Sequence, residues 1–301
     1  MEDSMKKNIA LCIVFLLLTV SAVWAGDYDD NLLLEAVREQ NVEKLERAIR
    51  WSSNVNTKVG SADKTVLMFA CEENWYEGVK LLLEGGFSAK GANASYRNNF
   101  GQTALMFAAQ KCKNQAIVNL LMQYNANLND SDNAGKTVLM YAVDNSSDNI
   151  FKFFIDAIGG SIDLKAVDKD GNNAMMYAAQ QGNLYAFKLL AKQAGVNWNQ
   201  TNTDGKNVLE IAVESGKLDI VQDICSRRNA VDPTCKNNAG QPVLFWLIEK
   251  NKSENVIEWM MRACGYDALM EMTDINGRDI NWYIQKYKNR RAQRILNQLK
   301  D

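Results

Sequence analysis

A motif of one polar residue followed by mostly apolar residues recurs along most of this chain. Its five clearest copies are Thr65–Ala70, Thr103–Ala108, Thr137–Ala142, Asn173–Ala178 and Asn207–Ala212. When the last residue marks the register, Ala36, Leu247 and Ile284 extend the series, and the successive spacings are 34, 38, 34, 36, 34, 35 and 37 residues. Periods of this length are typical of repeat proteins whose unit is a pair of helices.

The register predicts an all-α solenoid of about eight stacked helix–turn–helix repeats with short β-turn fingers. Each unit packs only on its neighbours, so we expect one elongated array over residues 26–301 and not two globular domains. The approximate units are 27–60, 61–97, 98–131, 132–167, 168–201, 202–236, 237–273 and 274–301.

The unit that begins at Asp132 shows how the pattern specifies a structure. Asp132 and Gly135 favour a tight turn, because Asp bonds its own backbone and Gly tolerates positive φ. Thr137 then caps the first helix, and losing such a cap costs about 0.5–2 kcal/mol. The equivalent caps are Thr65, Thr103, Asn173, Asn207 and Asp279. Pro242 takes this position in the seventh unit, which suggests a displaced helix start there.

The second helices supply most of the apolar bulk. Their apolar residues include Val79, Leu82 and Leu83, Ile117, Val118 and Leu121, Phe187 and Leu190, and Ile220, Val221 and Ile224. No isolated unit could bury these side chains, so stacking must supply the core. The end units are modified as caps, with Asp27, Asp29 and Asp30 before the first helix and Lys286, Lys288, Arg290, Arg291, Arg294 and Lys300 near the last.

These features in one register resemble the ankyrin repeat family over roughly residues 27–301. The resemblance rests on Gly135, Thr137, Leu139 and Ala142, and on the unit ending Ala126–Asn129. The usual His of the family is replaced by Met68, Met106, Met140 and Met176, and by Glu210. We expect these Met side chains to hold the array by packing, which a flexible thioether suits.

The first 25 residues differ from the rest. Lys6 and Lys7 precede an apolar run from Ile9 to Val20, and Ala25 completes a small-residue cleavage pattern. This order is typical of a secretory signal peptide, and the run is short for a membrane anchor. We therefore expect cleavage after Ala25 and a periplasmic or secreted bacterial protein with no stable membrane anchor.

Charge and cysteine content refine this picture. Removing Glu2, Asp3, Lys6 and Lys7 takes 34 basic and 36 acidic residues to 32 and 34, so no bulk charge favours nucleic acid. Cleavage also removes Cys12 and leaves Cys71, Cys112, Cys225, Cys235 and Cys264. A bridge between Cys235 and either Cys225 or Cys264 is compatible with an oxidising compartment. Cys71 is expected to be a small buried residue.

Groups for catalysis are scarce. The chain contains no histidine, which removes the commonest general base and metal ligand. Glu72 with Glu73, or Asp144 with Asp148, could act as acid and base, but such helix ends are ordinarily solvated. The Met column is better explained by packing than by metal binding, and the basic C-terminal helix by a solvated cap than by nucleic acid or lipid binding. We predict no enzyme activity, cofactor or metal.

The family resemblance implies a protein partner bound by turn tips and first-helix ends. Carried onto this sequence, the candidate contacts are Phe100, Gln102, Gln110, Lys111, Lys136, Asp144, Asn172, Gln181 and Lys206. Phe100 is the best anchor, unless it folds back onto Tyr96 or the next turn. The expected function is a monomeric, non-enzymatic scaffold acting outside the cytoplasm. A self-associating envelope component and a secreted host-interacting effector are the alternatives.

Overall fold

The computed structural model describes most of the chain beyond residue 31. The described residues are 32–51, 54–85, 90–145, 147–156, 162–193, 197–198, 200–227, 236, 240–250 and 254–300. The predictions for the leader, its cleavage site, the acidic residues 27–30 and Cys235 lie outside them. Within the described ranges, no helix is long and apolar enough to cross a membrane.

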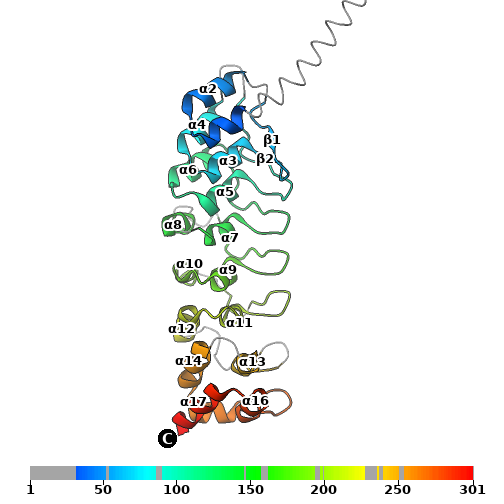
Figure 1. Ribbon diagram of the computed structural model, residues 1–301, viewed down its shortest axis with the longest axis vertical. Coiled ribbons are helices and arrows are strands. Elements are labelled where there is room, and N and C mark those ends of the chain that lie inside the picture. The colour runs from blue at the N-terminus through cyan, green and yellow to red at the C-terminus, as the bar shows by residue number, and fades with distance from the viewer. Residues whose placement is uncertain are drawn as a thin grey trace, which may run out of the picture. The chain divides into compact units, whose positions relative to one another are not determined.

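Helices follow one another in pairs along both of the compact units into which the chain divides (Figure 1). The first unit comprises residues 1–133 and 145–150, and the second comprises 134–144 and 151–301. A helical segment at 32–38 and α2 (Val42–Trp51) come first. The pairs that follow are α3 (Val66–Glu72) with α4 (Tyr76–Glu84), α5 (Ala104–Lys111) with α6 (Gln115–Gln123), α7 (Val138–Val143) with α8 (Asp148–Asp156), α9 (Ala174–Gln181) with α10 (Leu184–Leu190), and α11 (Val208–Glu214) with α12 (Leu218–Ser226).

The C-terminal part of the second unit is elaborated. It contains α13 (Val243–Lys250), α14 (Glu254–Cys264), a short α15 (Tyr266–Glu271), α16 (Ile280–Tyr287) and α17 (Arg290–Lys300). First helices pack on first helices, as α9 does on α11 and α13 on α16. Second helices likewise pack on second helices, as α12 does on α14 and α14 on α17. The helix–turn–helix prediction is thereby confirmed, while the number of repeats stays a prediction.

The predicted helix caps are mostly present. The side chains of Thr65, Thr137, Asn173, Asn207 and Asp279 each accept a hydrogen bond from the backbone N–H three residues later. Thr103 is the exception, and the prediction for it is wrong. Its backbone carbonyl accepts from Met106 N–H at 3.1 Å, and its buried hydroxyl has no hydrogen-bond partner among the described residues.

The expected displacement at Pro242 is also wrong. Helix α13 begins at Val243, directly after Pro242, just as α7 begins directly after Thr137. The Pro242 carbonyl accepts from the N–H groups of Phe245 and Trp246 at 2.9 and 3.1 Å. Proline is favourable beside a helix start because its missing N–H would have had no partner there, so the register survives without a side-chain cap.

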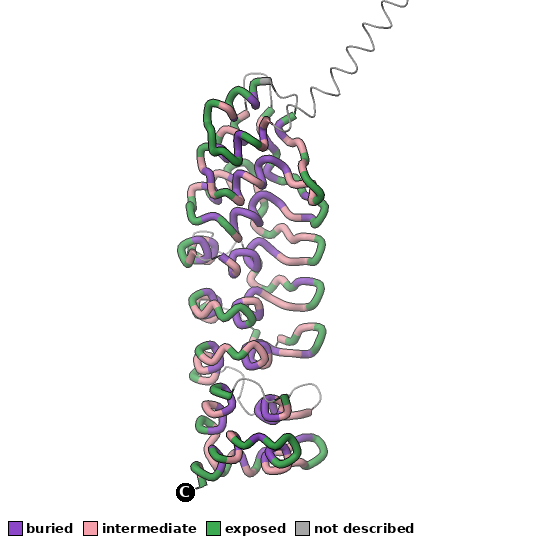
Figure 2. Tube along the Cα trace, in the orientation of Figure 1, coloured by how far each residue is buried: buried purple, intermediate pink, exposed green. Residues whose placement is uncertain are grey.

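The core lies between the two helix layers of each unit, where the tube in Figure 2 is mostly purple. Met68, Met106, Met140 and Met176 are all at most 2% exposed, which confirms their packing role. Two of them do more than was predicted. The sulfurs of Met68 and Met140 each accept the backbone N–H of the capping Thr at 3.4 Å. Thioether sulfur is a weak acceptor, so Met completes the capping box by a weak hydrogen bond as well as by packing.

Candidate functional site

The turn before each first helix projects as a finger. In the first unit, β1 (Lys58–Val59) pairs antiparallel with β2 (Lys64–Thr65) to form one of them. Further fingers are closed by an Asn or Asp side chain, as predicted. The Asp168 carboxylate accepts the N–H groups of Asp170 and Asn172 at 3.0 and 2.7 Å. The tip is therefore held by hydrogen bonds from its backbone to the buried Asp168 side chain and not by its outward side chains.

Adjacent fingers of the first unit are joined by backbone hydrogen bonds. Asn99 N–H donates to the Ala62 carbonyl at 3.1 Å, and Asn133 N–H donates to the Phe100 carbonyl at 2.8 Å. Gly101 has φ of +77°, and a Cβ placed on it would meet the backbone nitrogen of Asn133 at 2.7 Å. Glycine is required there because the fingers approach so closely.

The second unit repeats this ladder. Lys169 N–H donates to the Ala134 carbonyl and Thr203 N–H to the Asp170 carbonyl, both at 2.8 Å. Gly135 has φ of +82°, and a Cβ on it would lie 3.0 Å from the Asp168 Cα. Within each unit, the fingers therefore form a row fixed by main-chain contacts, which displays its tip side chains at regular spacing.

Phe100 is exposed on one such tip. Phe100 is 59% exposed and Tyr96 is 41% exposed, so the Phe100 ring is not buried against Tyr96. The backbone of Phe100 is held on both sides, since its N–H donates to Asn98 Oδ1 at 3.0 Å and its carbonyl accepts from Asn133. A rigidly held, exposed aromatic side chain fits the anchor role predicted for it.

Lys136 and Asp144, both predicted partner contacts, instead bind each other. Lys136 Nζ lies 2.9 Å from Asp144 Oδ2, and the two side chains are only 17% and 18% exposed. The ammonium also lies 4.5 Å from the centre of the Tyr141 ring and 4.7 Å from that of Tyr177. The description of Asp144 as a solvated helix end is therefore wrong, and the pair ties a finger to the end of its helix.

The same link recurs at a spacing of eight residues. Lys64 Nζ lies 2.8 Å from Glu72 and over the rings of Phe69 and Phe107, at 5.2 and 4.6 Å. Lys206 pairs with Glu214 at 2.7 Å. Gln241 Nε2 donates to Glu249 at 2.8 Å. The sequence carries this signal at four positions, because the residue before Thr65, Thr137, Asn207 or Pro242 and the residue eight positions later are complementary.

The other predicted contacts differ in availability. The Gln102 Oε1 accepts from Asn98 at 2.9 Å and the Asn172 Oδ1 from Asn202 at 3.0 Å, so both support fingers. Lys111 and Gln181 are exposed on the ends of α5 and α9, and Gln110 is half-buried. None of these positions has been tested as a partner contact, and all stay predictions.

Four ionisable groups have pKa values shifted by their surroundings. Burial alone would raise the pKa of Asp274, but Arg278, Tyr283 and two backbone N–H groups hold that pKa well below its usual range. Burial raises the pKa of Glu210, despite its hydrogen bond from the Asn207 N–H. Burial raises the pKa of the Cys112 thiol to about 12 and that of Cys71 well above normal, so neither is a thiolate at neutral pH.

The described residues hold no cluster of three or more potential metal ligands among His, Cys, Asp and Glu. Cys71 is fully buried, as expected. Cys225 on α12 and Cys264 on α14 are half-buried, and Cys235 lies outside the described ranges, so the bridge remains a prediction.

Comparison with known proteins identifies the repeat. A family model described as ankyrin repeats in three copies matches residues 33–132, 87–166 and 158–237, which together span well over half of the chain. An ankyrin repeat protein of Acanthamoeba polyphaga mimivirus is 27% identical over 200 residues, covering 58% of this chain and 26% of its own length. The chain thus spans about a quarter of the length of this curated relative.

Proposed function

Because the chain belongs to the ankyrin repeat family, we propose that it is a non-enzymatic scaffold that binds a protein partner through its finger tips and the exposed ends of its first helices. Ankyrin repeats are protein-interaction modules, and the family match supports this class of function. The observation that carries the proposal is Phe100. Its main chain is fixed by Asn98 and Asn133, while its ring remains in solvent.

We choose among the predicted binding residues by their side-chain contacts. A hot-spot residue must reach the partner without breaking the scaffold, and Lys136 and Asp144 fail this requirement because they neutralise each other. Lys111 and Gln181 meet it, since both are exposed. We therefore centre the proposed binding surface on Phe100 and Lys111 of the first unit, and treat Gln181 of the second unit as a separate candidate contact.

The proposal also includes export, motivated by the leader-like first 25 residues. Fractionation of the native host, followed by N-terminal sequencing, should find the protein outside the cytoplasm with Gly26 as its first residue. Recovery of a cytoplasmic protein that retains residues 1–25 would refute export without affecting the binding proposal.

Binding is tested by crosslinking in intact cells, identification of the crosslinked protein, and titration with that purified partner. Phe100→Ala should weaken its binding at least tenfold, since truncating a hot spot typically costs about 2 kcal/mol or more. The matched control is Tyr124→Ala. Tyr124 is also an exposed aromatic residue of the first unit, at 37%, but it follows the second helix α6. Equal losses for the two variants, or none for Phe100→Ala, would contradict the assigned surface.

A further inference from the structure

An uncompensated group of cations occupies the last two helices. From Ile280 to Lys300 the sequence contains no Asp or Glu and six basic residues. Five of these are exposed and form no ion pair with any described residue, and we call them the basic patch: Lys286, Lys288, Arg290, Arg294 and Lys300. This differs from the finger positions, where Lys64, Lys136 and Lys206 are all neutralised.

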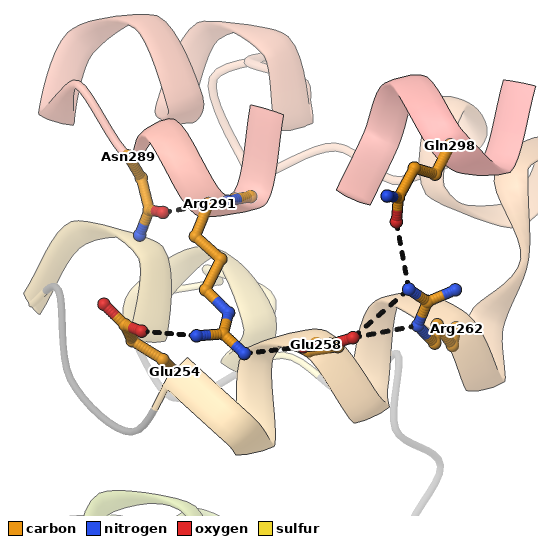
Figure 3. Close-up of polar contacts among 7 residues, drawn as sticks. Glu254, Glu258, Arg262, Asn289, Arg291 and Gln298 are labelled. Atoms are coloured by element: carbon orange, nitrogen blue, oxygen red, sulfur yellow. Dashed lines mark hydrogen bonds and ion pairs between the residues drawn. The ribbon is translucent and has the colours of Figure 1, made fainter. Parts of the chain in front are cut away.

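The sixth cation shows what a structural role looks like here. Arg291 bridges Glu254 and Glu258 of α14, with both distances at 2.7 Å (Figure 3). Arg262 joins the same Glu258 at 3.2 Å and also donates to Gln298 of α17 at 3.0 Å. These contacts clamp α17 to α14 and use the acids of that helix, and the basic patch takes no part in them.

The clamp fixes the direction in which Arg290 and Arg294 of the basic patch face. Ala292, Ile295 and Leu296 form the buried stripe of α17, and α17 packs on α14. Arg290 and Arg294 are one helical turn apart on the opposite side, since residues four apart share a face. Lys286 and Lys288 lie at the junction of α16 and α17. The patch is therefore a fixed part of the folded surface.

The placement of Arg290 is unfavourable for α17 itself. Asn289 caps α17 by accepting the Ala292 N–H at 2.9 Å. Arg290 and Arg291 occupy the first turn of α17, where the helix dipole is positive and acidic residues are favoured. Lys286 and Lys288 lie at the C-terminal end of α16, where the dipole favours cations. A cap that needed only solubility would be better served by Asp or Glu. The arrangement favours a negatively charged partner.

The neighbouring groups distinguish between polyanions. Nucleic acids without secondary structure are usually held by stacking bases on open aromatic faces. Here the Arg278 guanidinium lies 4.4 Å from the centre of the Trp282 ring, and Tyr287 stacks on Tyr283 with ring centres 6.0 Å apart. Trp282 is half-buried and Tyr287 is 36% exposed, so each still reaches the surface. Tyr and Trp beside Lys and Arg suit the headgroup region of a bilayer.

We propose that the basic patch docks the folded protein on an anionic lipid bilayer. Attachment is electrostatic and does not insert α17, because the apolar stripe of that helix is already buried. Asp267 and Glu271 of the adjacent α15 are exposed and form no ion pair with the patch, so they weaken the local field without cancelling it. The proposal goes beyond the scaffold function by giving the scaffold a location.

Vesicle cosedimentation tests this with the full chain. Binding is compared between two kinds of vesicle, at low and at high salt. One kind contains phosphatidylcholine with about 30 mol% of the anionic lipid phosphatidylglycerol, and the other contains phosphatidylcholine alone. The test variant is Lys286→Gln/Arg290→Gln/Arg294→Gln. The matched control is Lys165→Gln/Lys188→Gln/Lys192→Gln, which removes three exposed cations elsewhere in the second unit. All proteins share residues 1–31, including Lys6 and Lys7, so the difference between wild type and each variant excludes any contribution from that segment.

We expect selective binding to the anionic vesicles that high salt abolishes. The test variant should lose about fivefold in partition coefficient for each cation removed, about a hundredfold in all, and the control should lose less than fivefold. Equal losses in both variants, or binding independent of lipid charge, would overturn the proposal. So would patch-dependent binding to a single-stranded or duplex oligonucleotide with none to vesicles.

Folding of the variants is checked by thermal melting. The test variant should melt close to the wild-type temperature, because Arg290→Gln relieves repulsion at the start of α17 while Lys286→Gln removes a favourable charge at the end of α16. If it melts lower, Arg294→Gln alone, which lies outside the first turn, replaces it with an expected fivefold loss.

Discussion

The link between Lys136 and Asp144 gives the most informative stability prediction. Lys136→Met keeps most of the aliphatic stem and its packing, but leaves the Asp144 carboxylate, 18% exposed, without its ammonium partner. A fully exposed pair is worth about 0–1 kcal/mol, and breaking a fully buried one costs about 3–5 kcal/mol. Contacts with two aromatic rings add about 0.5–2 kcal/mol. For this largely buried pair we expect a loss of about 2–3 kcal/mol.

Urea unfolding of wild type, Lys136→Met, Asp144→Asn and the double variant isolates the pair in a double-mutant cycle. We expect a coupling energy of about 1–2 kcal/mol between the two side chains. The matched control is Lys152 with Asp156 on α8, a pair 3.9 Å apart with both side chains 55% exposed. Its coupling energy should be about 0.3–0.5 kcal/mol, the value for an exposed ion pair four residues apart on a helix.

The result that would refute this reasoning is a coupling no larger than that of the exposed control. If Lys136→Met also left stability unchanged while weakening partner binding, Lys136 would be a contact residue, as the sequence first suggested. The measurement thus separates a structural role from a binding role at the same position.

Three further predictions follow from the fold. Thr103→Val should leave the urea midpoint unchanged or raise it, because the Thr103 hydroxyl is buried without a described partner, whereas Thr137→Val should lose about 1 kcal/mol of cap energy. Gly135→Ala should cost about 2 kcal/mol or more, from positive φ together with the approach to Asp168, and Gly277→Ala, at the equivalent finger position with φ of +73° and open space, should cost only about 1 kcal/mol. The lowered pKa of Asp274 contributes stability that is fully present above the pKa of an unfolded Asp and is lost as the pH falls below it. When urea midpoints are measured against pH, those of Asp274→Asn should therefore fall less steeply than those of wild type below about pH 4.

The sequence predicted the repeat and its packing because those depend on local, recurring signals. The polar cap, the apolar face with Ala142 and the turn glycine Gly135 each act within a few residues. The predictions for Thr103 and Pro242 were wrong because helix capping depends on side-chain geometry and not on residue type alone. At Thr103 the backbone carbonyl receives the bonds that the hydroxyl was expected to share.

The candidate surface was harder to predict, for a different reason. Whether a charged residue is free depends on what stands opposite it in the folded chain, and Lys136 has both Asp144 and a ring from the next first helix beside it. The sequence identified Phe100 as a candidate anchor by its residue type, but only the structure shows that its ring is not covered by Tyr96. Even so, the eight-residue spacing of Lys206 and Glu214 was visible in the sequence and could have been used.

The backbone ladder between fingers has a consequence for how such a protein diverges. Lys169 and Asp170 contribute main-chain groups to the ladder through N–H and carbonyl, which every residue other than proline supplies. Their side chains are exposed and can be exchanged with little penalty to the fold. Natural variation, or a randomised library at tip positions, can therefore alter what the protein recognises while the scaffold stays the same.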